Sequence, residues 1–217
     1  MGKKENDFYE YFAKYHIESL YKTQNLSFKK SERPDFLSER NSIGLEVTRA
    51  YIEEWKQRDA VVEKYLGKGL SFLEVKRRVE ADCKHGFEGR LFDINGTAAY
   101  SPTKGMYNTK IHELRITESI EEKTELLENY KKCHEFWLYI WSFYILIDMG
   151  TISRVNEFYS EMQQPLQFLK IFIRAREDLY LLQKGKPLEI SKMDQITYNE
   201  VRKLALVEAG LPELIDK

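Results

Sequence analysis

Hydrophobic residues along the chain follow two spacings, and the first of these is typical of helices. In residues 5–22, Phe8, Phe12 and Tyr15 recur at steps of four and three, which predicts an amphipathic helix near the N-terminus. Glu18 lies at the border of this apolar stripe. A carboxylate in that position is either solvated or turned towards a cleft beside the core.

Residues 42–50 show a period of two instead, which predicts a strand with one buried face. The two alternating rows are Ile43, Leu45 and Val47 on one side and Gly44, Glu46 and Thr48 on the other. A polar turn at residues 39–42 separates this strand from a short segment at residues 34–37. Turns of this length join antiparallel strands, so we predict a hairpin.

The remaining segments alternate between helical and strand-like patterns. We predict helices at residues 53–66, 71–82, 107–130, 152–162 and 194–208. The aromatic and aliphatic run at residues 135–147 predicts a buried central strand, although its periodicity also permits a buried helix. A strand or hairpin is expected at residues 168–182, and a long irregular segment at residues 84–104. This mixture predicts an α/β fold with antiparallel and parallel strand pairs.

Length and charge limit the architecture and the partners. With 217 residues, of which 42% are hydrophobic, the chain can bury a full core and has the size of one ordinary domain. We therefore expect a single domain over residues 1–217, with a core at about 5–147 and additions at 148–217. The 34 Lys and Arg residues nearly cancel the 35 Asp and Glu residues, so any binding to nucleic acid must be local.

Other features narrow the class of protein further. The two cysteines lie far apart and the N-terminus lacks a signal-peptide pattern, so we expect a reduced, cytoplasmic protein. The longest apolar stretch, at residues 136–147, is shorter than the roughly 20 residues that span a bilayer, so no membrane association is expected. Glycine motifs for dinucleotides or phosphate loops are missing, and we expect no organic cofactor.

The candidate chemistry centres on two carboxylates that the predicted hairpin brings together. Pairing Leu37 with Gly44 places Asp35 opposite Glu46, and the alternation puts both, with Thr48, on one face. Opposed carboxylates with β-carbons about 5 Å apart repel each other unless something compensates their charge. A hard divalent cation is one such compensation. The alternative is a surface hairpin whose two acids happen to face solvent.

The residues around this pair resemble the signature of the PD-(D/E)XK nucleases. Pro34 and Asp35, followed by IGLEVT at residues 43–48, are similar to the Pro-Asp and Glu-x-Lys elements of that superfamily, and a helix carrying Glu18 precedes them. The resemblance covers the first 50 residues and, more loosely, residues 123–140. It implies a restriction-endonuclease-like αβββαβ core, that is, a mixed sheet flanked by helices, with helical insertions and a C-terminal extension.

The same resemblance implies a metal centre. Asp35 and Glu46 would be carboxylate ligands of Mg²⁺ or Mn²⁺, the carbonyl of Val47 a further oxygen ligand, and Glu18 an auxiliary acid. The chain departs from the pattern at the lysine position, which Thr48 occupies. A neutral hydroxyl positions a water or a phosphate oxygen but does not supply the positive charge of a lysine.

Lys123 is the cation that we expect to replace the missing lysine. It lies within the hydrophobic stripe of Ile116, Ile120 and Leu127, where an uncompensated ammonium group is costly. The competing interpretation is that the side chain passes the core and keeps its ammonium group in water.

These patterns favour a metal-dependent, nuclease-like protein that hydrolyses phosphodiester bonds in DNA. Two alternatives stay open. One is a catalytically degenerate protein of the same fold that binds nucleic acid or a protein partner. The other is an unrelated α/β interaction protein.

Overall fold

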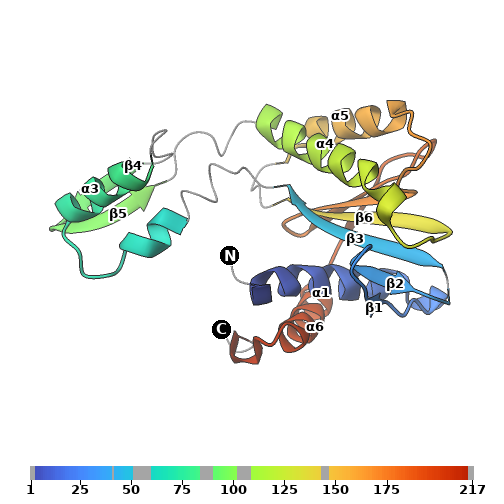
Figure 1. The fold of residues 1–217 in the computed structure, drawn as a ribbon, viewed down its shortest axis with the longest axis horizontal. Coiled ribbons are helices and arrows are strands. Elements are labelled where there is room, and N and C mark those ends of the chain that lie inside the picture. The colour runs from blue at the N-terminus through green and yellow to red at the C-terminus, as the bar shows by residue number, and fades with distance from the viewer. Residues whose placement is uncertain are drawn as a thin grey trace. The chain divides into compact units, whose positions relative to one another are not determined.

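A mixed β-sheet lies between two layers of helices in the larger part of the chain (Figure 1). The structure is a computed structural model and describes residues 3–40, 42–50, 60–83, 90–101, 109–142 and 147–214. Its contacts divide the chain into two compact units. Unit 1 comprises Met1–Ala50 and Thr109–Lys217, and unit 2 comprises Tyr51–Asn108. The expected single-domain organisation stays a prediction.

The sheet of unit 1 combines antiparallel and parallel pairs. In sheet order its strands are β1 (Lys29–Lys30), β2 (Phe36–Ser38), β3 (Ile43–Ala50), β6 (Glu135–Ser142), β7 (Lys170–Ala175), β8 (Asp178–Leu182) and β9 (Glu189–Lys192). The strands β1, β2 and β3 pair antiparallel, β6 and β7 continue the sheet parallel to β3, and β8 and β9 are again antiparallel. This mixed sheet confirms the α/β class predicted from the sequence.

Helices cover both faces of this sheet. The helices of unit 1 are α1 (Lys3–Leu20), α4 (Thr109–Glu125), α5 (Met149–Glu161) and α6 (Gln195–Glu208), with short 3₁₀ turns η1 (Lys22–Gln24), η3 (Leu127–Asn129) and η4 (Pro212–Leu214). Figure 1 shows α4 and α5 on one face and α1 and α6 on the other. With the 3₁₀ turns left aside, the first elements of unit 1 follow in the chain order α1, β1, β2, β3, α4, β6.

Alternation along β3 decides which of its side chains meets which helix. Leu45 and Val47 pack in a core cluster with Ile17 of α1. Ala50 packs in a second cluster with Ile116 of α4. Because successive strand residues point to opposite faces, the even-numbered residues of β3 face α4.

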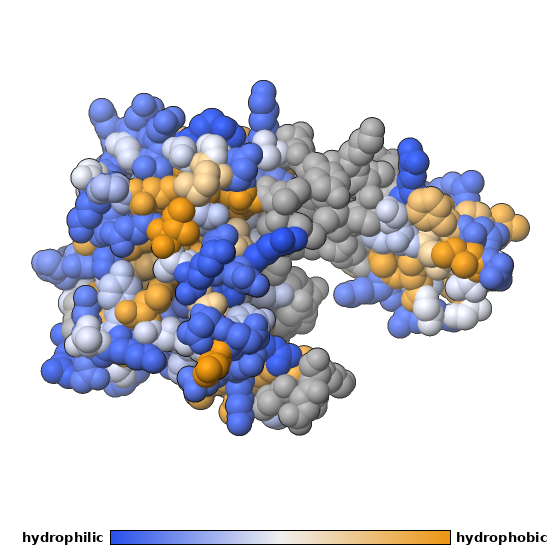
Figure 2. All heavy atoms as spheres, turned by 180° about the vertical axis from the view of Figure 1, so that it is seen from behind, coloured by the Kyte–Doolittle hydropathy of each residue, from blue (hydrophilic) through white to orange (hydrophobic). Residues whose placement is uncertain are grey.

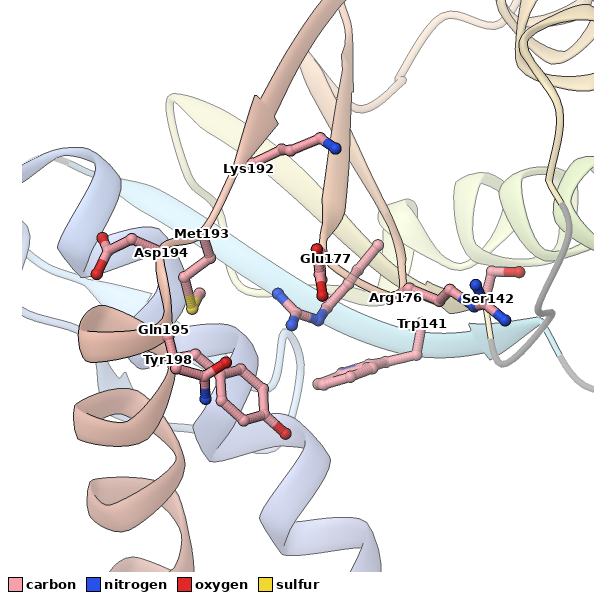
Figure 3. A pocket seen from close by; sticks show the side chains of 10 residues that line it. Trp141, Ser142, Arg176, Glu177, Lys192, Met193, Asp194, Gln195 and Tyr198 are labelled. Atoms are coloured by element: carbon pink, nitrogen blue, oxygen red, sulfur yellow. The ribbon is translucent and has the colours of Figure 1, made fainter.

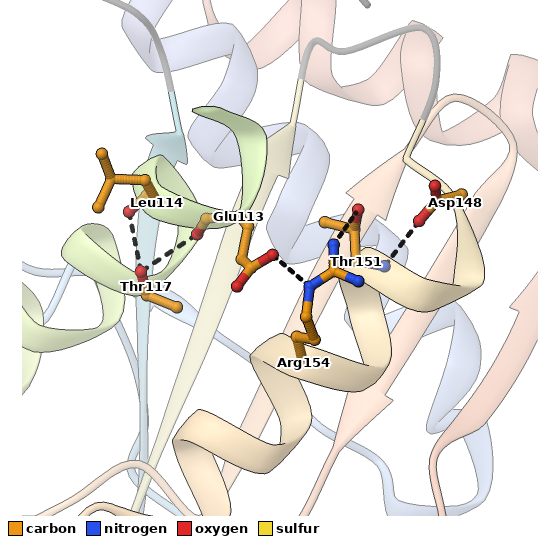
Figure 4. A network of polar contacts seen from close by, with 6 residues as sticks. All are labelled: Glu113, Leu114, Thr117, Asp148, Thr151 and Arg154. Atoms are coloured by element: carbon orange, nitrogen blue, oxygen red, sulfur yellow. Dashed lines mark hydrogen bonds and ion pairs between the residues drawn. The ribbon is translucent and has the colours of Figure 1, made fainter. Parts of the chain in front are cut away.

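A polar network fixes α4 against α5 (Figure 4). The Arg154 Nε atom of α5 donates to the Glu113 carboxylate of α4 at 2.5 Å, and the Arg154 guanidinium also donates to the Thr151 hydroxyl at 3.3 Å. The Asp148 carboxylate caps the start of α5 by accepting from the Thr151 amide at 2.6 Å. These contacts bind the first turns of α4 and α5 together, and α4 carries Lys123 three turns further on.

Unit 2 is a small helix and hairpin assembly. It contains helical residues 60–65, the helix α3 (Phe72–Asp82), and the antiparallel hairpin of β4 (Arg90–Ile94) and β5 (Thr97–Ser101). Ser71 and Glu74 form a reciprocal capping box at the start of α3. Val75 and Val79 of α3 pack with Ala98 of β5, which gives the unit its own hydrophobic cluster.

The predicted irregular segment at residues 84–104 is wrong where the structure describes it, because residues 90–101 form the β4–β5 hairpin. Asn95 and Gly96 form its turn with φ of 54° and 82°. Asn-Gly is the pair best suited to these left-handed angles in a two-residue turn. Residues 84–89 and 102–104 lie outside the described residues.

Most other predicted elements agree with the structure. The run at residues 135–147 forms a strand over its described part, β6, which excludes the buried helix, and residues 143–146 lie outside the described residues. The predicted helix at 107–130 is shorter, because α4 ends at Glu125 and η3 follows. The predicted helix at 53–66 is described only at residues 60–65, where it is helical.

Hydrophilic and hydrophobic side chains are mixed on the visible surface. On the face that Figure 2 shows, hydrophilic side chains surround small groups of hydrophobic ones. Exposed large hydrophobic residues, such as Leu73 and Ile196, come from different elements. Isolated apolar side chains of this kind are normal on a protein surface.

Candidate functional site

The β2–β3 hairpin has the register predicted from the alternation. Leu37 pairs with Gly44 and Phe36 pairs with Leu45 in antiparallel strands. Continuing this register by one residue places Asp35 opposite Glu46. The predicted register is thereby confirmed, and the effect of the Glu46 charge on Asp35 agrees with the predicted proximity of the two carboxylates.

A close backbone approach holds the start of β2 against β3. A β-carbon added at Gly44 would lie 2.7 Å from Pro34 Cγ and 3.0 Å from Phe136 Cδ1. These distances are shorter than normal contacts, so only glycine leaves room for the Pro34 ring. The backbone carbonyl of Arg33 also accepts from the Lys131 amide at 3.1 Å. Together these contacts position Asp35, the next residue in the chain.

The environment of Asp35 makes its ionisation harder than that of an exposed aspartate. Its Oδ2 atom accepts a hydrogen bond from the Val47 amide at 2.8 Å. Burial, and next the negative charge of Glu46, raise the pKa of Asp35 from 3.8 to about 6. The Val47 amide, Lys30 and Lys123 act in the opposite direction. The carboxylates are therefore close enough to destabilise each other.

Lys123 reaches this pair from α4, as the sequence predicts. Its Nζ atom lies 2.5 Å from Oε1 of Glu46, and the two side chains are 24% and 6% exposed. The competing interpretation, in which the ammonium group stays in water away from the site, is wrong. Lys123 lies 77 residues after Glu46 in the chain, and α4 brings the two side chains together.

Tyr130 is a member of the site that the sequence analysis did not single out. This buried residue follows η3, and its hydroxyl forms a hydrogen bond with the Glu46 carboxylate. Burial, and next the charge of Glu46, raise the pKa of Tyr130 well above its usual range. The hydroxyl therefore stays protonated and donates to Glu46. In the sequence, Tyr130 belongs to the apolar stripe of the preceding helix, so its spacing indicates only packing.

The positions of Val47 and Thr48 agree with the roles that the resemblance implies. In a strand, the N–H and C=O of one residue point to the same side, and the Val47 N–H points to Asp35. The Val47 carbonyl therefore faces the side from which Asp35 approaches. Thr48 shares the α4-facing row of β3 with Glu46 and is partly buried.

Glu18 is not brought to the carboxylate pair. Its Oε1 atom accepts a hydrogen bond from the Phe28 amide at 2.8 Å. Burial raises the pKa of Glu18, and the groups that oppose this rise are the Phe28 amide and Lys14. Its helix, α1, packs on the face of β3 that carries Leu45 and Val47, whereas Glu46 faces α4. An auxiliary role for Glu18 in the same site therefore has no support in this geometry.

The donor atoms at the site suit an ion such as Mg²⁺, which keeps water ligands, better than a metal whose ligands all come from the protein. Within the described ranges, no group of three or more His, Cys, Asp or Glu side chains is arranged to hold a metal ion. Asp35, Glu46 and the Val47 carbonyl supply hard oxygen donors. Mg²⁺ keeps several waters and binds through one or two carboxylates together with substrate phosphate, so a two-carboxylate site suits it.

Positive charge lies on the side of the site next to the β1–β2 connection. Arg33 is exposed, and its charge acts on the Tyr130 hydroxyl. Lys131 is also exposed, and its Nζ atom donates to the Ser31 hydroxyl at 3.2 Å. Exposed cations near a carboxylate pair are suited to a polyanion such as a phosphodiester chain.

Comparison of the chain with protein-family models, curated proteins and solved structures gives no match. Among the helices in the described part of the chain, none combines the length and the apolar character needed to cross a bilayer.

Proposed function

We propose that unit 1 is a metal-dependent nuclease that hydrolyses phosphodiester bonds in DNA. The observation that carries this proposal is the convergence of Asp35, Glu46 and Lys123, which come from three separate elements. Two carboxylates and a lysine are the groups that a metal-dependent nuclease needs for its cation and for the charge on the phosphate.

The architecture supports the same proposal. The order α1, β1, β2, β3, α4, β6 is the order expected for a restriction-endonuclease-like core. The antiparallel β1–β2–β3 meander followed by the parallel strand β6 also agrees with it. In this assignment α3, β4 and β5 belong to an insertion between β3 and α4, and the elements after β6 are a C-terminal extension.

The proposal gives each residue of the site a role. Asp35, Glu46 and the Val47 carbonyl would hold Mg²⁺ or Mn²⁺, which polarises a phosphodiester and lowers the pKa of a bound water. Lys123 would place positive charge beside the scissile phosphate, and Thr48 would position a phosphate oxygen or water.

The test is cleavage of linear and supercoiled DNA with Mg²⁺ or Mn²⁺ by the wild type and by Asp35→Asn and Glu46→Gln. Each substitution removes a ligand charge with little change in volume, so each should lower cleavage by at least about 100-fold. Glu39→Gln is the matched control, because Glu39 lies in the same hairpin but is exposed, and its ion pair among the described residues is with the exposed Lys29. Wild-type cleavage that survives both substitutions would contradict this active site.

A second candidate function is a catalytically degenerate protein of the same fold that binds nucleic acid or a protein partner. The observation that favours it is the 2.5 Å ion pair of Lys123 with Glu46, which gives this carboxylate a counter-ion other than a metal. Under this alternative, the wild type binds DNA or a partner without cleaving DNA, and neither Mg²⁺ nor Mn²⁺ produces heat in a calorimetric titration, even when DNA is bound.

A further inference from the structure

A second polar centre lies on the other face of the sheet, next to α1 and α6. Here a cavity of about 930 Å³ opens at the carboxyl ends of β6 and β7 (Figure 3). Trp141 and Tyr198 form apolar walls, and Arg174 borders the cavity from β7. The lining residues all belong to unit 1, and none of them is a member of the Asp35 site.

Arg174 is the unusual member of this lining. Its side chain is only 4% exposed. The guanidinium carbon lies 4.8 Å from the ring centre of Phe12, 5.4 Å from that of Trp141 and 5.7 Å from that of Tyr198. Stacking on aromatic rings accommodates a weakly hydrated guanidinium but leaves its positive charge uncompensated.

The hydrogen-bond partners of Arg174 that the structure describes are neutral. One guanidinium nitrogen lies 3.4 Å from Nδ1 of His16, and another contact joins the guanidinium to the Tyr139 hydroxyl. Burial, and next the charge of Arg174, lower the pKa of His16 from 6.5 to about 3, so this histidine is neutral at pH 7. Since arginine only donates, Nδ1 of His16 is an acceptor, and the Tyr139 hydroxyl donates to it at 2.8 Å.

The two acidic residues of the lining form no ion pair with Arg174. The Asp194 carboxylate caps α6 by accepting from the amides of Ile196 and Thr197 at 3.0 and 2.9 Å. Glu177 lies in the β7–β8 turn and lines the cavity (Figure 3), and the structure shows no ion pair between its carboxylate and Arg174. Arg176 adds a further cation to the lining, whereas the Lys192 ammonium lies 3.5 Å from the Asp178 carboxylate. A buried charge without an ionic partner is costly, so a ligand anion would complete this centre.

We propose that this cavity binds a nucleoside monophosphate, with its phosphate on Arg174 and its base against Trp141 and Tyr198. A guanidinium binds phosphate oxygens in a fixed bidentate geometry. Aromatic walls stack with nucleobases of any sequence. The volume lies within the range of small-molecule sites. The ligand is either a free nucleotide or the 5′-phosphorylated end of a DNA strand, which share this chemistry.

The test is calorimetric titration of the full chain with dAMP in EDTA, which excludes any contribution from metal-dependent cleavage. Deoxyadenosine and inorganic phosphate each supply half of the ligand and should bind at least about tenfold more weakly than dAMP. Oligonucleotides with and without a 5′-phosphate distinguish a free nucleotide from the end of a DNA strand. If the ligand is a strand end, the phosphorylated oligonucleotide should bind as tightly as dAMP. If the ligand is a free nucleotide, this oligonucleotide should bind more weakly than dAMP. Absence of dAMP binding, or equal affinity for deoxyadenosine, would overturn the proposal.

Arg174→Met should weaken dAMP binding by at least about tenfold, since it removes the charge and keeps an apolar side chain of similar length. Lys170→Met is the matched control. Lys170 lies on the same strand with its ammonium 4.2 Å from the Trp137 ring centre, but it does not line the cavity. Its substitution should change the affinity by less than about twofold. Equal affinity of Arg174→Met and the wild type would overturn the proposal.

Tyr198→Leu tests the aromatic wall while Arg174 itself stays in place. It should weaken dAMP binding by a larger factor than it weakens binding of inorganic phosphate, because it removes a base-stacking surface while the guanidinium keeps the rings of Phe12 and Trp141. Unchanged dAMP affinity in this variant would contradict the placement of the base. Tighter binding of benzoate than of dAMP would assign the site to carboxylates and overturn the nucleotide assignment.

Discussion

At the scale of single residues, Lys123 and Glu46 can be tested as a unit. Lys123→Met leaves a 6% exposed carboxylate without its cation, which should lower the free energy of unfolding by about 1–3 kcal/mol. The double variant Lys123→Met, Glu46→Gln should be less destabilised than the sum of the two single changes, because neither charge then remains alone. Denaturant unfolding of the four proteins measures this coupling. Strictly additive effects would show that the ion pair does not form in solution.

Asp35 gives the stability a specific dependence on pH. Its pKa is raised in the folded state from 3.8 to about 6, so the folded protein binds more protons than the unfolded chain between these values. Protonation of Asp35 therefore contributes its whole stabilising effect below pH 3.8. This contribution to the free energy of unfolding, at most about 3 kcal/mol, is lost as the pH rises through 6. Asp35→Asn should therefore be more stable than the wild type at pH 8 and gain much less at pH 4.

His16 has the opposite sign, since its lowered pKa makes the folded state less stable as pH falls from 6.5 towards 3. Comparing Asp35→Asn with the wild type at each pH cancels this contribution, because His16 is present in both proteins. A stability difference that stays constant from pH 4 to pH 8 would contradict the raised pKa of Asp35.

At the scale of elements, the fit between Pro34 and Gly44 determines where Asp35 lies. Gly44→Ala should lower the free energy of unfolding by about 1–3 kcal/mol, because its β-carbon would overlap the Pro34 ring. It should also lower cleavage more than the stability loss explains, since Asp35 moves with the ring. Gly150→Ala is the control, because its β-carbon meets the flexible end of Arg154 at 3.3 Å. Equal effects of both substitutions in thermal melts and cleavage assays would contradict this account.

The sequence predicted those elements in which one pattern dominates. Strict alternation in residues 43–48 and a turn of ordinary length were enough to predict the β2–β3 register. The place of Lys123 within an apolar helix stripe was enough to predict that its side chain points towards Glu46. The β4–β5 hairpin was missed because its strands are mostly exposed and lack an apolar row, which leaves only the Asn95-Gly96 pair as a signal. Glu18 was misplaced because helical spacing does not say which face of a sheet a helix will cover.

At the scale of the whole molecule, the two candidate sites lie on opposite faces of one sheet. The carboxylate pair faces α4, and Arg174 faces α1 and α6. Sequence patterns did not indicate the second site. Its residues are spread from Trp141 to Tyr198 over three strands and a helix, so they form no local motif. A net charge near zero also gives no information about a single buried cation. Only tertiary structure shows that Arg174 lacks an acidic partner among the described residues.

The ion pair of Lys123 with Glu46 also determines how ligands would assemble on the protein. A cation arriving alone must compete with the ammonium group for Glu46, so it gains little. A DNA phosphate offers Lys123 a new partner and releases the carboxylate. Cation and DNA should therefore strengthen each other's binding by the same factor, as thermodynamic linkage requires. Titrations of Mn²⁺ with and without a non-cleavable phosphorothioate DNA should show this cooperativity in the wild type and its loss in Lys123→Met. Such a protein would carry no stored metal at rest and would complete its centre only on its substrate.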